Sequence, residues 1–232
     1  MRHLIATDRA RPLTSLACYH TNLFAFEREG VEYGVVGCAV GAASAVLVAE
    51  ELFASGCKFL IGITSACQIA PVQAPPYFII LDRALRDEGT SYHYLPPAEY
   101  SLADEGLVRL AHRALSAAGT TVQVGAAWTT DAPFRETAEA IAAAKDAGIL
   151  AVEMEAAALY AFATARKQSV LCFAHVTNQM GRVEGDFEKG GRRRGGRVSE
   201  CDLAGGAWLA PPVTARTRRC DGWRLFRKWA CS

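Results

Sequence analysis

The sequence predicts a single α/β domain, a three-layer sandwich in which helices cover both faces of a mixed central sheet. Short apolar runs of strand length alternate with helical segments along most of the chain, and the clearest strand, helix and strand are predicted at 149–152, 156–166 and 170–176. The 232 residues, 51% of them hydrophobic, suit one domain with a full core. Because the composition changes after residue 189, we place the domain at 1–189 and an Arg/Gly-rich tail at 190–232.

The remaining elements follow from the same patterns. Apolar runs predict further strands at 31–40, 58–63, 77–81 and 121–128. Helical segments are predicted at 45–54, at 99–118 and from about Asp131 to residue 148. Thr130 or Asp131 is the expected cap of the last helix, with Pro133 near its first turn.

The composition excludes several classes of protein. The formal net charge is +1, so no strong overall field favours nucleic acid or a membrane surface. No apolar run reaches the roughly 18 residues of a membrane span, and charge interrupts the start of the chain too early for a signal peptide. The eight cysteines form no C-x-x-C pair, and several lie in apolar runs, which is typical of reduced core residues. We therefore expect a cytoplasmic protein without nucleic acid, membrane or metal.

The segment 147–180 predicts where the functional site lies. Its strand–helix–strand unit is the element of a parallel sheet. Glu153 and Glu155 follow the first strand, and Asn178 follows the second. Ligands of open α/β sheets bind at the carboxyl ends of the strands, so we expect these side chains in one crevice. A structural interpretation stays open at this point, because acidic residues also stabilise a helix start and Asn also forms turns.

The run VEMEAAALYAFA at 152–163, followed by a strand and VTN at 176–178, resembles the nucleoside phosphorylase family. This family includes the hexameric purine nucleoside phosphorylases and the uridine phosphorylases, and its V-E-M-E motif carries a Met and a Glu that hold the ribose. The resemblance implies that Glu155 accepts hydrogen bonds from the ribose hydroxyls, that Met154 packs under the ribose, and that Glu153 supports them.

Asn178 departs from the family pattern. It lies where the hexameric purine phosphorylases carry an Asp that protonates the leaving purine. An amide is no general acid, but it donates to N7 while it accepts from a neighbouring N–H. The departure points to a 6-oxopurine nucleoside or to an atypical substrate, and the resemblance gives catalytic roles to Asn178 and Glu155.

The predicted phosphate site combines a match with two departures. The turn Gly41-Ala42-Ala43-Ser44 before a helix is similar to the family's Gly-Ile-Gly-x-x-Ser segment, so Gly41 and Ser44 are candidate phosphate ligands, although tight packing alone would also explain the turn. The family's Gly-Asp-Pro-x-Arg loop has no counterpart in the sequence. Gly62 stands where many members carry a phosphate-binding Arg, and a charge-assisted bond is about twice as strong as a neutral one.

Neighbouring positions match better. Thr64 and Ser65 lie in the segment that corresponds to Arg-Val-Gly-Thr/Ser-x-Gly, and the resemblance implies contacts of this segment with ribose or phosphate. The run 86–94 resembles a further family segment and makes Arg86 a candidate phosphate ligand. Either another cation replaces the missing Arg, or water replaces phosphate as the acceptor. The candidate cations are Arg9, Arg11 and Arg86.

The base-binding segment is expected after the strand at 121–128. There the family supplies an aromatic residue that packs on the base, a role that the resemblance gives to Phe134. Arg135 is expected to contact a base or ribose edge, or else to pair with a surface acid. The Gln and Arg spacing that reads uracil in uridine phosphorylases does not occur here, which favours a purine.

The tail at 190–232 has a different character. Its Arg-Gly runs with aromatic residues are of a kind that can bind RNA. We favour the plainer hypothesis that the reading frame is shifted beyond about Lys189 and that the tail is non-native. A compact, protease-resistant tail would contradict it.

Together these features predict an enzyme, a pentosyltransferase that cleaves a purine nucleoside with inorganic phosphate as co-substrate and without a cofactor. The alternatives are a nucleosidase that uses water and a catalytically inactive nucleoside-binding protein. The resemblance also implies a homo-oligomer, a dimer or a hexamer, in which a neighbour's histidine often reaches the ribose. The candidate histidines are His3, His20 and His93.

Overall fold

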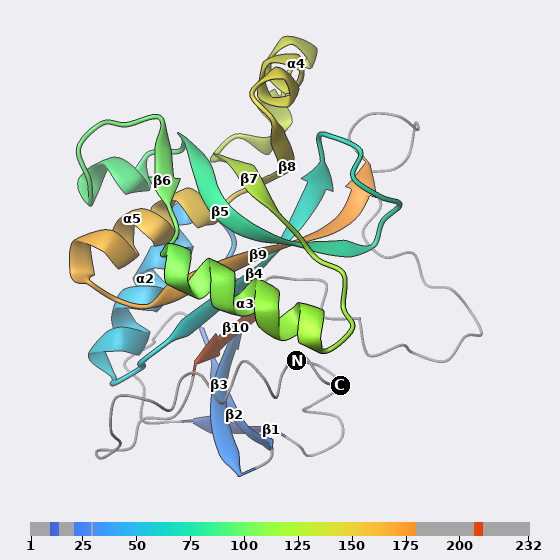
Figure 1. Cartoon of the computed structure of the whole chain (residues 1–232). Helices are drawn as coiled ribbons and strands as arrows, with labels where there is room; N and C mark the ends of the chain where they lie inside the picture. Colours follow the sequence, from blue (N-terminus) through green and yellow to red (C-terminus); the bar gives the residue numbers. More distant parts are fainter. Residues whose placement is uncertain (1–9, 14–20, 29, 180–206, 211–232) are drawn as a thin grey trace, which may run out of the picture.

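A ten-stranded sheet forms the centre of the structure, a computed structural model that describes residues 10–13, 21–28, 30–179 and 207–210 (Figure 1). The strands are β1 (Ala10–Leu13), β2 (Leu23–Arg28), β3 (Val31–Gly37), β4 (Leu60–Gln68), β5 (Tyr77–Asp87), β6 (Tyr100–Leu102), β7 (Gln123–Thr130), β8 (Ile149–Glu153), β9 (Val170–Gln179) and β10 (Ala207–Ala210). The helices are α2 (Ala42–Ala54), α3 (Glu105–Ala117), α4 (Ala138–Asp146) and α5 (Ala156–Arg166), with 3-10 turns η1 (Thr90–His93) and η2 (Pro133–Arg135). The strand order is β1-β2-β3-β10-β4-β8-β7-β5-β6, and β9 pairs with both β4 and β5.

Helices cover both faces of this sheet. Helices α2 and α5 pack on one face, where their apolar residues share a core with Leu60 and Cys172. Helix α3 packs on the other face, where Val108 and Leu115 share a second core with Ile61. Successive residues of a strand point to opposite faces, so Leu60 and Ile61 belong to different cores. The predicted three-layer α/β sandwich with a mixed sheet is confirmed.

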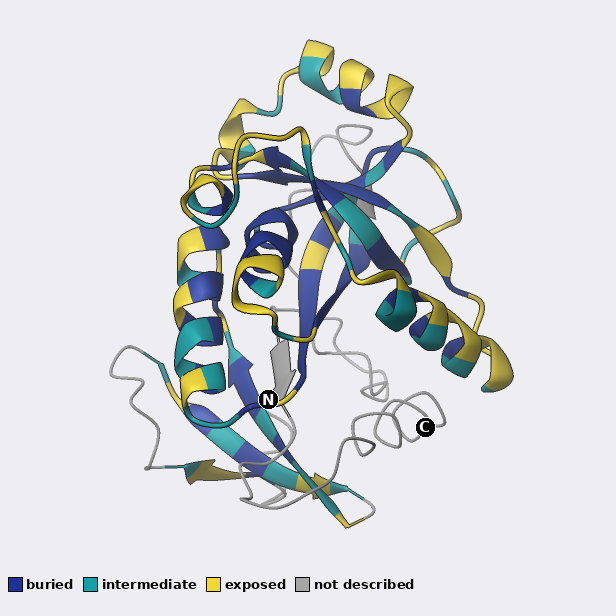
Figure 2. Ribbon diagram, turned by 60° about the vertical axis from the view of Figure 1, so that its left-hand side comes forward, coloured by how far each residue is buried: buried dark blue, intermediate teal, exposed yellow. Residues whose placement is uncertain are grey.

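Burial differs sharply between the helices (Figure 2). Every residue of α5 from Ala156 to Phe162 is buried, which fits a helix that is apolar all round. Helix α4, at the top of Figure 1, buries only Ala144. Helix α5, the segment between β8 and β9, is thus a central part of the core, and this packing holds its first turn in place.

The strands on either side of α5 run in opposite directions. Strands β4 and β9 are parallel to each other, whereas β8 is antiparallel to β4. The expectation of a parallel strand–helix–strand unit is therefore wrong. The carboxyl ends of the two strands still meet, because β8 overlaps only the last residues of β4. Cys67 is the Cα partner of Val152 in β8 and of Asn178 in β9.

Two strands are longer than the sequence predicts. Strand β4 continues to Gln68, and β5 continues to Asp87. Both extensions keep sheet partners, which sequence periodicity does not show: β4 stays paired with β9, and β5 with β7. Thr64 and Ser65 are consequently strand residues, and their side chains point to opposite faces of the sheet.

Two helices begin later than expected. The segment predicted as one helix from residue 99 first forms β6, and α3 begins after Asp104, whose side chain accepts from the Leu107 amide at 2.9 Å. Helix α4 is capped by Thr137, not by Thr130 or Asp131. Thr130 instead accepts from the amide of Ala132 in the turn before η2, at 3.1 Å.

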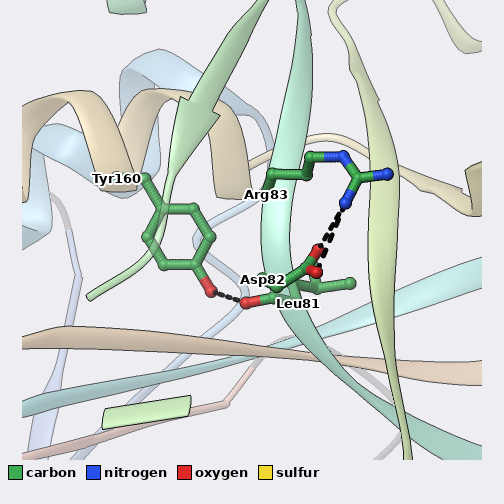
Figure 3. A network of polar contacts seen from close by, with 4 residues as sticks. All are labelled: Leu81, Asp82, Arg83 and Tyr160. Atoms are coloured by element: carbon green, nitrogen blue, oxygen red, sulfur yellow. Dashed lines mark hydrogen bonds and ion pairs between the residues drawn. The ribbon is translucent and has the colours of Figure 1, made fainter. Parts of the chain in front are cut away.

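A tyrosine hydroxyl joins β5 and β9 where these strands separate, and Figure 3 shows its contact with β5. Their antiparallel pairing runs as far as Ile80 and Phe173. One residue further, the Tyr160 hydroxyl donates to the Leu81 carbonyl at 2.6 Å and accepts from the Cys172 amide at 3.0 Å. The hydroxyl takes the place of a direct bond between the strands and satisfies two buried backbone groups.

A β-bulge follows at Asp82. In the pairing of β5 with β7, Leu81 is opposite Gly125 and Arg83 is opposite Ala126, so Asp82 is the extra residue. Its carboxylate accepts from the Arg83 guanidinium at 3.3 Å, the second contact drawn in Figure 3. A bulge bends a strand, and β5 exchanges β9 for β6 as its partner at this position.

Strand β10 lies between β3 and β4 and pairs antiparallel with both. It comes from the tail predicted beyond residue 189, so this part of the tail adds a strand to the sheet of the domain. The boundary at 189 and the frame shift stay predictions. The predictions for Arg9, His3, His20 and the Arg-Gly runs concern residues outside the described ranges. No helix in the part of the chain that the structure describes is long and apolar enough to cross a membrane.

Candidate active site

A buried carboxylate, Glu155, lies where β8 gives way to α5. It is the N-cap residue of α5 and is 8% exposed. Its Oε1 accepts a hydrogen bond from the backbone N–H of Gly41 at 2.6 Å, and its Oε2 accepts one from the Thr64 hydroxyl at 2.5 Å. The turn before α2, the end of β4 and the start of α5 therefore meet at one carboxylate.

The turn before α2 provides the first of these contacts. Gly41 has φ +87° and ψ 154°, a conformation that is essentially restricted to glycine. Its N–H lies at the start of α2, where amides lack an acceptor within the helix. A Cβ placed on Gly41 would meet no atom within 4 Å among the residues that the structure describes. Ser44 lies half-buried in the first turn of the same helix.

Glu153 holds the first turn of α5 in place. Its Oε2 accepts from the amides of Glu155 and Ala156, at 2.8 and 2.9 Å. Its Oε1 accepts from the Thr129 hydroxyl, and Thr129 in turn accepts from the amide of Ala157 at 3.0 Å. Glu153 and Thr129 thus satisfy three amides at the start of the helix. Glu153 thereby holds the backbone of Glu155, while its supporting role toward a ribose stays a prediction.

Thr129 is the residue of this arrangement that the sequence analysis missed. It lies opposite Glu153 in the register of β7 and β8 and is fully buried. The available signal was a pair of threonines, Thr129 and Thr130, directly after the predicted strand. The sequence analysis considered only Thr130 of this pair, as a helix cap. The pairing of β7 with β8 is needed to show that Thr129 lies opposite Glu153.

The two carboxylates share a buried environment that raises both pKa values. Burial, and then the charge of Glu155, raises the pKa of Glu153 to about 8, although the bonds from Thr129 and the two amides oppose this shift. Burial also raises the pKa of Glu155, against the bonds from Thr64 and Gly41. At pH 7 the pair therefore carries less than two full negative charges.

These pKa shifts predict how stability depends on pH. Glu153 has an ordinary pKa of 4.5 and a folded pKa of about 8, so between these values the folded protein keeps a proton that the unfolded chain has released. The free energy of unfolding should therefore fall as the pH rises through this window. We expect Glu153→Gln to flatten this slope, measured by urea denaturation between pH 5 and pH 8. Glu105→Gln, at an exposed position of α3, is the control. Equal slopes in both variants would contradict the prediction.

A pocket lies beside the two carboxylates. It is lined by residues of β4, α5, β9 and the segments around them, namely Ala39, Gly62, Ile63, Thr64, Glu153, Glu155, Ala156, Leu159 and Cys172. Gly62, at the position where the family carries an Arg, forms part of this wall. No Lys or Arg is among the described residues that line it. Nor do three or more His, Cys, Asp or Glu side chains gather as metal ligands anywhere within the described ranges.

Other predicted site residues lie near the same strand ends. Met154 is half-buried between the two glutamates in sequence. Ser65 points to the face of β4 opposite Thr64, where it is exposed and its Oγ lies 3.5 Å from the Thr177 hydroxyl. The backbone of Asn178 is at the end of β9, beside Cys67. The structure therefore brings Thr64, Glu153 and Glu155 into contact and places Ser65 on the other side of the sheet.

The predicted base-binding residues stand apart from this pocket. Phe134 is 83% exposed and lies in η2 with Arg135, which is also exposed. Neither lines the pocket beside Glu155. His93, at the end of η1, is exposed as well. Their roles toward a base or a ribose stay predictions.

Two of the arginines considered as replacement cations are engaged elsewhere. Arg86 is buried, and its guanidinium donates to the Ser91 hydroxyl at 2.8 Å and to the Pro96 carbonyl at 2.7 Å. Arg11 forms an exposed ion pair with Glu32 at 2.5 Å. A phosphate role for Arg86 would require its bonds within the loop to break.

Comparison with known proteins identifies the family of the chain. Residues 7–200 match the phosphorylase superfamily. The chain belongs to this superfamily. It is 27% identical to a DeoD-type purine nucleoside phosphorylase of Streptococcus uberis over 154 residues, which cover 66% of this chain and 65% of that protein. It is 28% identical to the DeoD-type purine nucleoside phosphorylase of Streptococcus pyogenes serotype M5 over 158 residues, or 66% of this chain and 67% of that protein.

The chain thus spans about two thirds of the length of the curated relatives that it matches. The family that the VEMEAAALYAFA run predicts is confirmed. The roles that the resemblance gives to Glu153, Met154 and Glu155 toward a sugar stay predictions.

Proposed function

We propose that this member of the phosphorylase superfamily is a nucleoside phosphorylase that acts on a purine nucleoside. The observation that carries the proposal is Glu155, a buried carboxylate oriented by Gly41 and Thr64 on the wall of a pocket. An ionised carboxylate only accepts hydrogen bonds, which suits the hydroxyl groups of a sugar. The similarity to DeoD-type purine nucleoside phosphorylases supports the choice of a purine base.

In the proposed reaction, an oxygen of inorganic phosphate attacks the anomeric carbon while the bond from this carbon to the base nitrogen breaks. The sugar ring becomes positively charged in the transition state, and the fixed negative charges of Glu155 and of the phosphate stabilise it. The base leaves with the bonding electron pair and takes up, through solvent, the proton that the hydrogen phosphate releases, so the products are ribose 1-phosphate and the free base. We assign donation to purine N7 to Asn178, packing under the sugar to Met154, and packing on the base to Phe134.

A second candidate is a nucleosidase, in which water attacks in place of phosphate. The wall of the pocket favours it, because Gly62 stands at the position of the family's Arg and no Lys or Arg lines the pocket within the described residues. Of the neutral groups predicted to hold phosphate, Ser65 lies on the other side of the sheet and the Gly41 amide is bonded to Glu155, so Ser44 or an arginine from elsewhere would have to hold it. A neutral group also brings no positive charge to the anion and fewer N–H donors than the fork of an arginine.

Release of free base from a panel of nucleosides, with and without phosphate, tests both candidates. We expect cleavage of inosine or guanosine that requires phosphate and yields ribose 1-phosphate. Cleavage at the same rate without phosphate, with free ribose as product, would identify a nucleosidase. Binding of a nucleoside without release of its base would identify a catalytically inactive binding protein and would contradict both enzymes.

The cellular compartment and the oligomeric state of the enzyme are part of the same proposal. The four cysteines of the described ranges are free thiols, which suits the reducing cytoplasm. We also propose a homo-oligomer, a dimer or a hexamer. The mass of the protein in solution should be measured on the sample used for the nucleoside panel, since a monomer with full activity would contradict this part of the proposal.

A further inference from the structure

We propose that Thr64 sets the sugar specificity of this site, so that 2′-deoxyribonucleosides are preferred to ribonucleosides. The inference rests on the proposed function, in which Glu155 accepts hydrogen bonds from the sugar. It concerns the two oxygens of that carboxylate, whose surroundings differ.

The Oε1 atom of Glu155 is bonded to a backbone amide and not to a side chain. This amide belongs to Gly41, where an added Cβ would meet no atom of the described residues within 4 Å. A sugar hydroxyl that donates to Oε1 would share this oxygen with the amide and need not displace the Thr64 hydroxyl. One lone pair of this oxygen remains available after the bond from the amide.

The Oε2 atom is covered by Thr64. The hydroxyl of Thr64 donates to it at 2.5 Å, and the branched side chain of Thr64 is only 7% exposed. The other acceptor within reach of this hydroxyl is the Ser65 carbonyl at 3.3 Å, which is the weaker partner at that distance. The proton of the Thr64 hydroxyl therefore stays with Glu155.

Thr64 cannot easily move away. It lies within β4, where its Cα partner is Ala174 in β9, and a β-branched side chain has few rotamers open to it. The methyl group and the hydroxyl of Thr64 thus stay beside Oε2 when a ligand enters.

The two kinds of sugar need different numbers of acceptors. A ribonucleoside presents vicinal 2′ and 3′ hydroxyls, which a carboxylate receives best with one oxygen each. A 2′-deoxynucleoside presents the 3′ hydroxyl alone, and Oε1 is enough for it. The 2′ hydroxyl of a ribonucleoside must compete with Thr64 or stay without a strong acceptor. The expected preference is about tenfold, equivalent to one ordinary hydrogen bond of about 1.4 kcal/mol.

The test compares kcat/KM for 2′-deoxyinosine and inosine in the wild type, Thr64→Val and Thr64→Ser. Valine keeps the shape of threonine without the hydroxyl, and serine keeps the hydroxyl. We expect the wild type and Thr64→Ser to prefer the deoxynucleoside about tenfold and Thr64→Val to lose this preference. Thr64→Ala serves as a second variant without the hydroxyl if Thr64→Val does not fold.

Three results would overturn the proposal. The first is a wild type without preference for the deoxynucleoside. The second is an equal fall of both activities in Thr64→Val, which would show that Thr64 only positions Glu155. The third is a fall confined to inosine, which would show that the Thr64 hydroxyl receives the 2′ hydroxyl.

Dissociation constants separate this inference from the proposed function. Calorimetry with the same two nucleosides needs no turnover. A binding preference that Thr64→Val abolishes, in a protein that cleaves neither nucleoside, would contradict the proposed activity and support the role of Thr64. Binding of neither nucleoside would overturn both.

Discussion

Replacement of Glu155 by Gln is expected to lower kcat/KM for nucleoside cleavage by about 100-fold while the fold is retained. The substitution removes the negative charge that faces the sugar and keeps the shape of the side chain. Hydrogen bonds to charged groups contribute about 1.5–3 kcal/mol, and a loss of about 2.7 kcal/mol in the transition state is a factor of about 100. The fold should tolerate the change, because the amide oxygen can accept from the Gly41 N–H while the Thr64 hydroxyl turns to accept from the new NH2 group.

Base release and urea denaturation should be measured on the same preparations. Glu105→Gln makes the same chemical change at an exposed position of α3 and should leave both quantities unchanged. A fall in kcat and in kcat/KM by the same factor would place the contribution of Glu155 in the transition state. Full activity of Glu155→Gln with unchanged stability would remove Glu155 from the catalytic site and, with it, the observation on which the proposed function rests.

Tyr160→Phe is expected to lower the free energy of unfolding by about 2–4 kcal/mol. The hydroxyl of Tyr160 bridges the Leu81 carbonyl and the Cys172 amide, and burial raises its pKa, so it remains a donor at any ordinary pH. Its removal leaves two buried backbone groups without partners, at a cost of about 1–3 kcal/mol each.

The control for this prediction is Tyr92→Phe. The Tyr92 hydroxyl also donates to a backbone carbonyl, that of Arg86, but the residue is 45% exposed and water can replace the bond. Urea denaturation should show a loss below about 1 kcal/mol for this variant. Similar losses for the two variants would mean that the hydrogen bonds of the Tyr160 hydroxyl contribute no more to the free energy of unfolding than an ordinary surface hydrogen bond.

The sequence predicted best where local pattern and burial agree. Helix α5 has the predicted bounds because its residues 156–162 are apolar on all sides and are buried on all sides. The direction of the strands on either side of it was mistaken, since strand direction depends on the partners that a strand finds in the sheet. The bounds of β4 and β5 were too short for the same reason: their last residues are held by pairing rather than by an apolar pattern.

The candidate site shows the same division. Glu153 and Glu155 could be found because they lie two positions apart at a recognisable strand end. Thr64 and Ser65 were grouped because they are adjacent in sequence, yet the extension of β4 through both sends their side chains to opposite faces. Thr129 could not be assigned without the register that sets it opposite Glu153. Contacts such as Gly41 with Glu155 join segments more than a hundred positions apart, and no local pattern encodes them.

The place of β10 has a consequence for the order in which the protein forms during synthesis. Strands β3 and β4 leave the ribosome early, yet the strand between them pairs Ala207 with Gly37 on one side and with Ile63 on the other. Until this last strand is made, both neighbours present unpaired edges, which are templates for association with other chains. The sheet therefore closes only after residues 207–210 have been made, and chains that stop before them are expected to aggregate rather than fold.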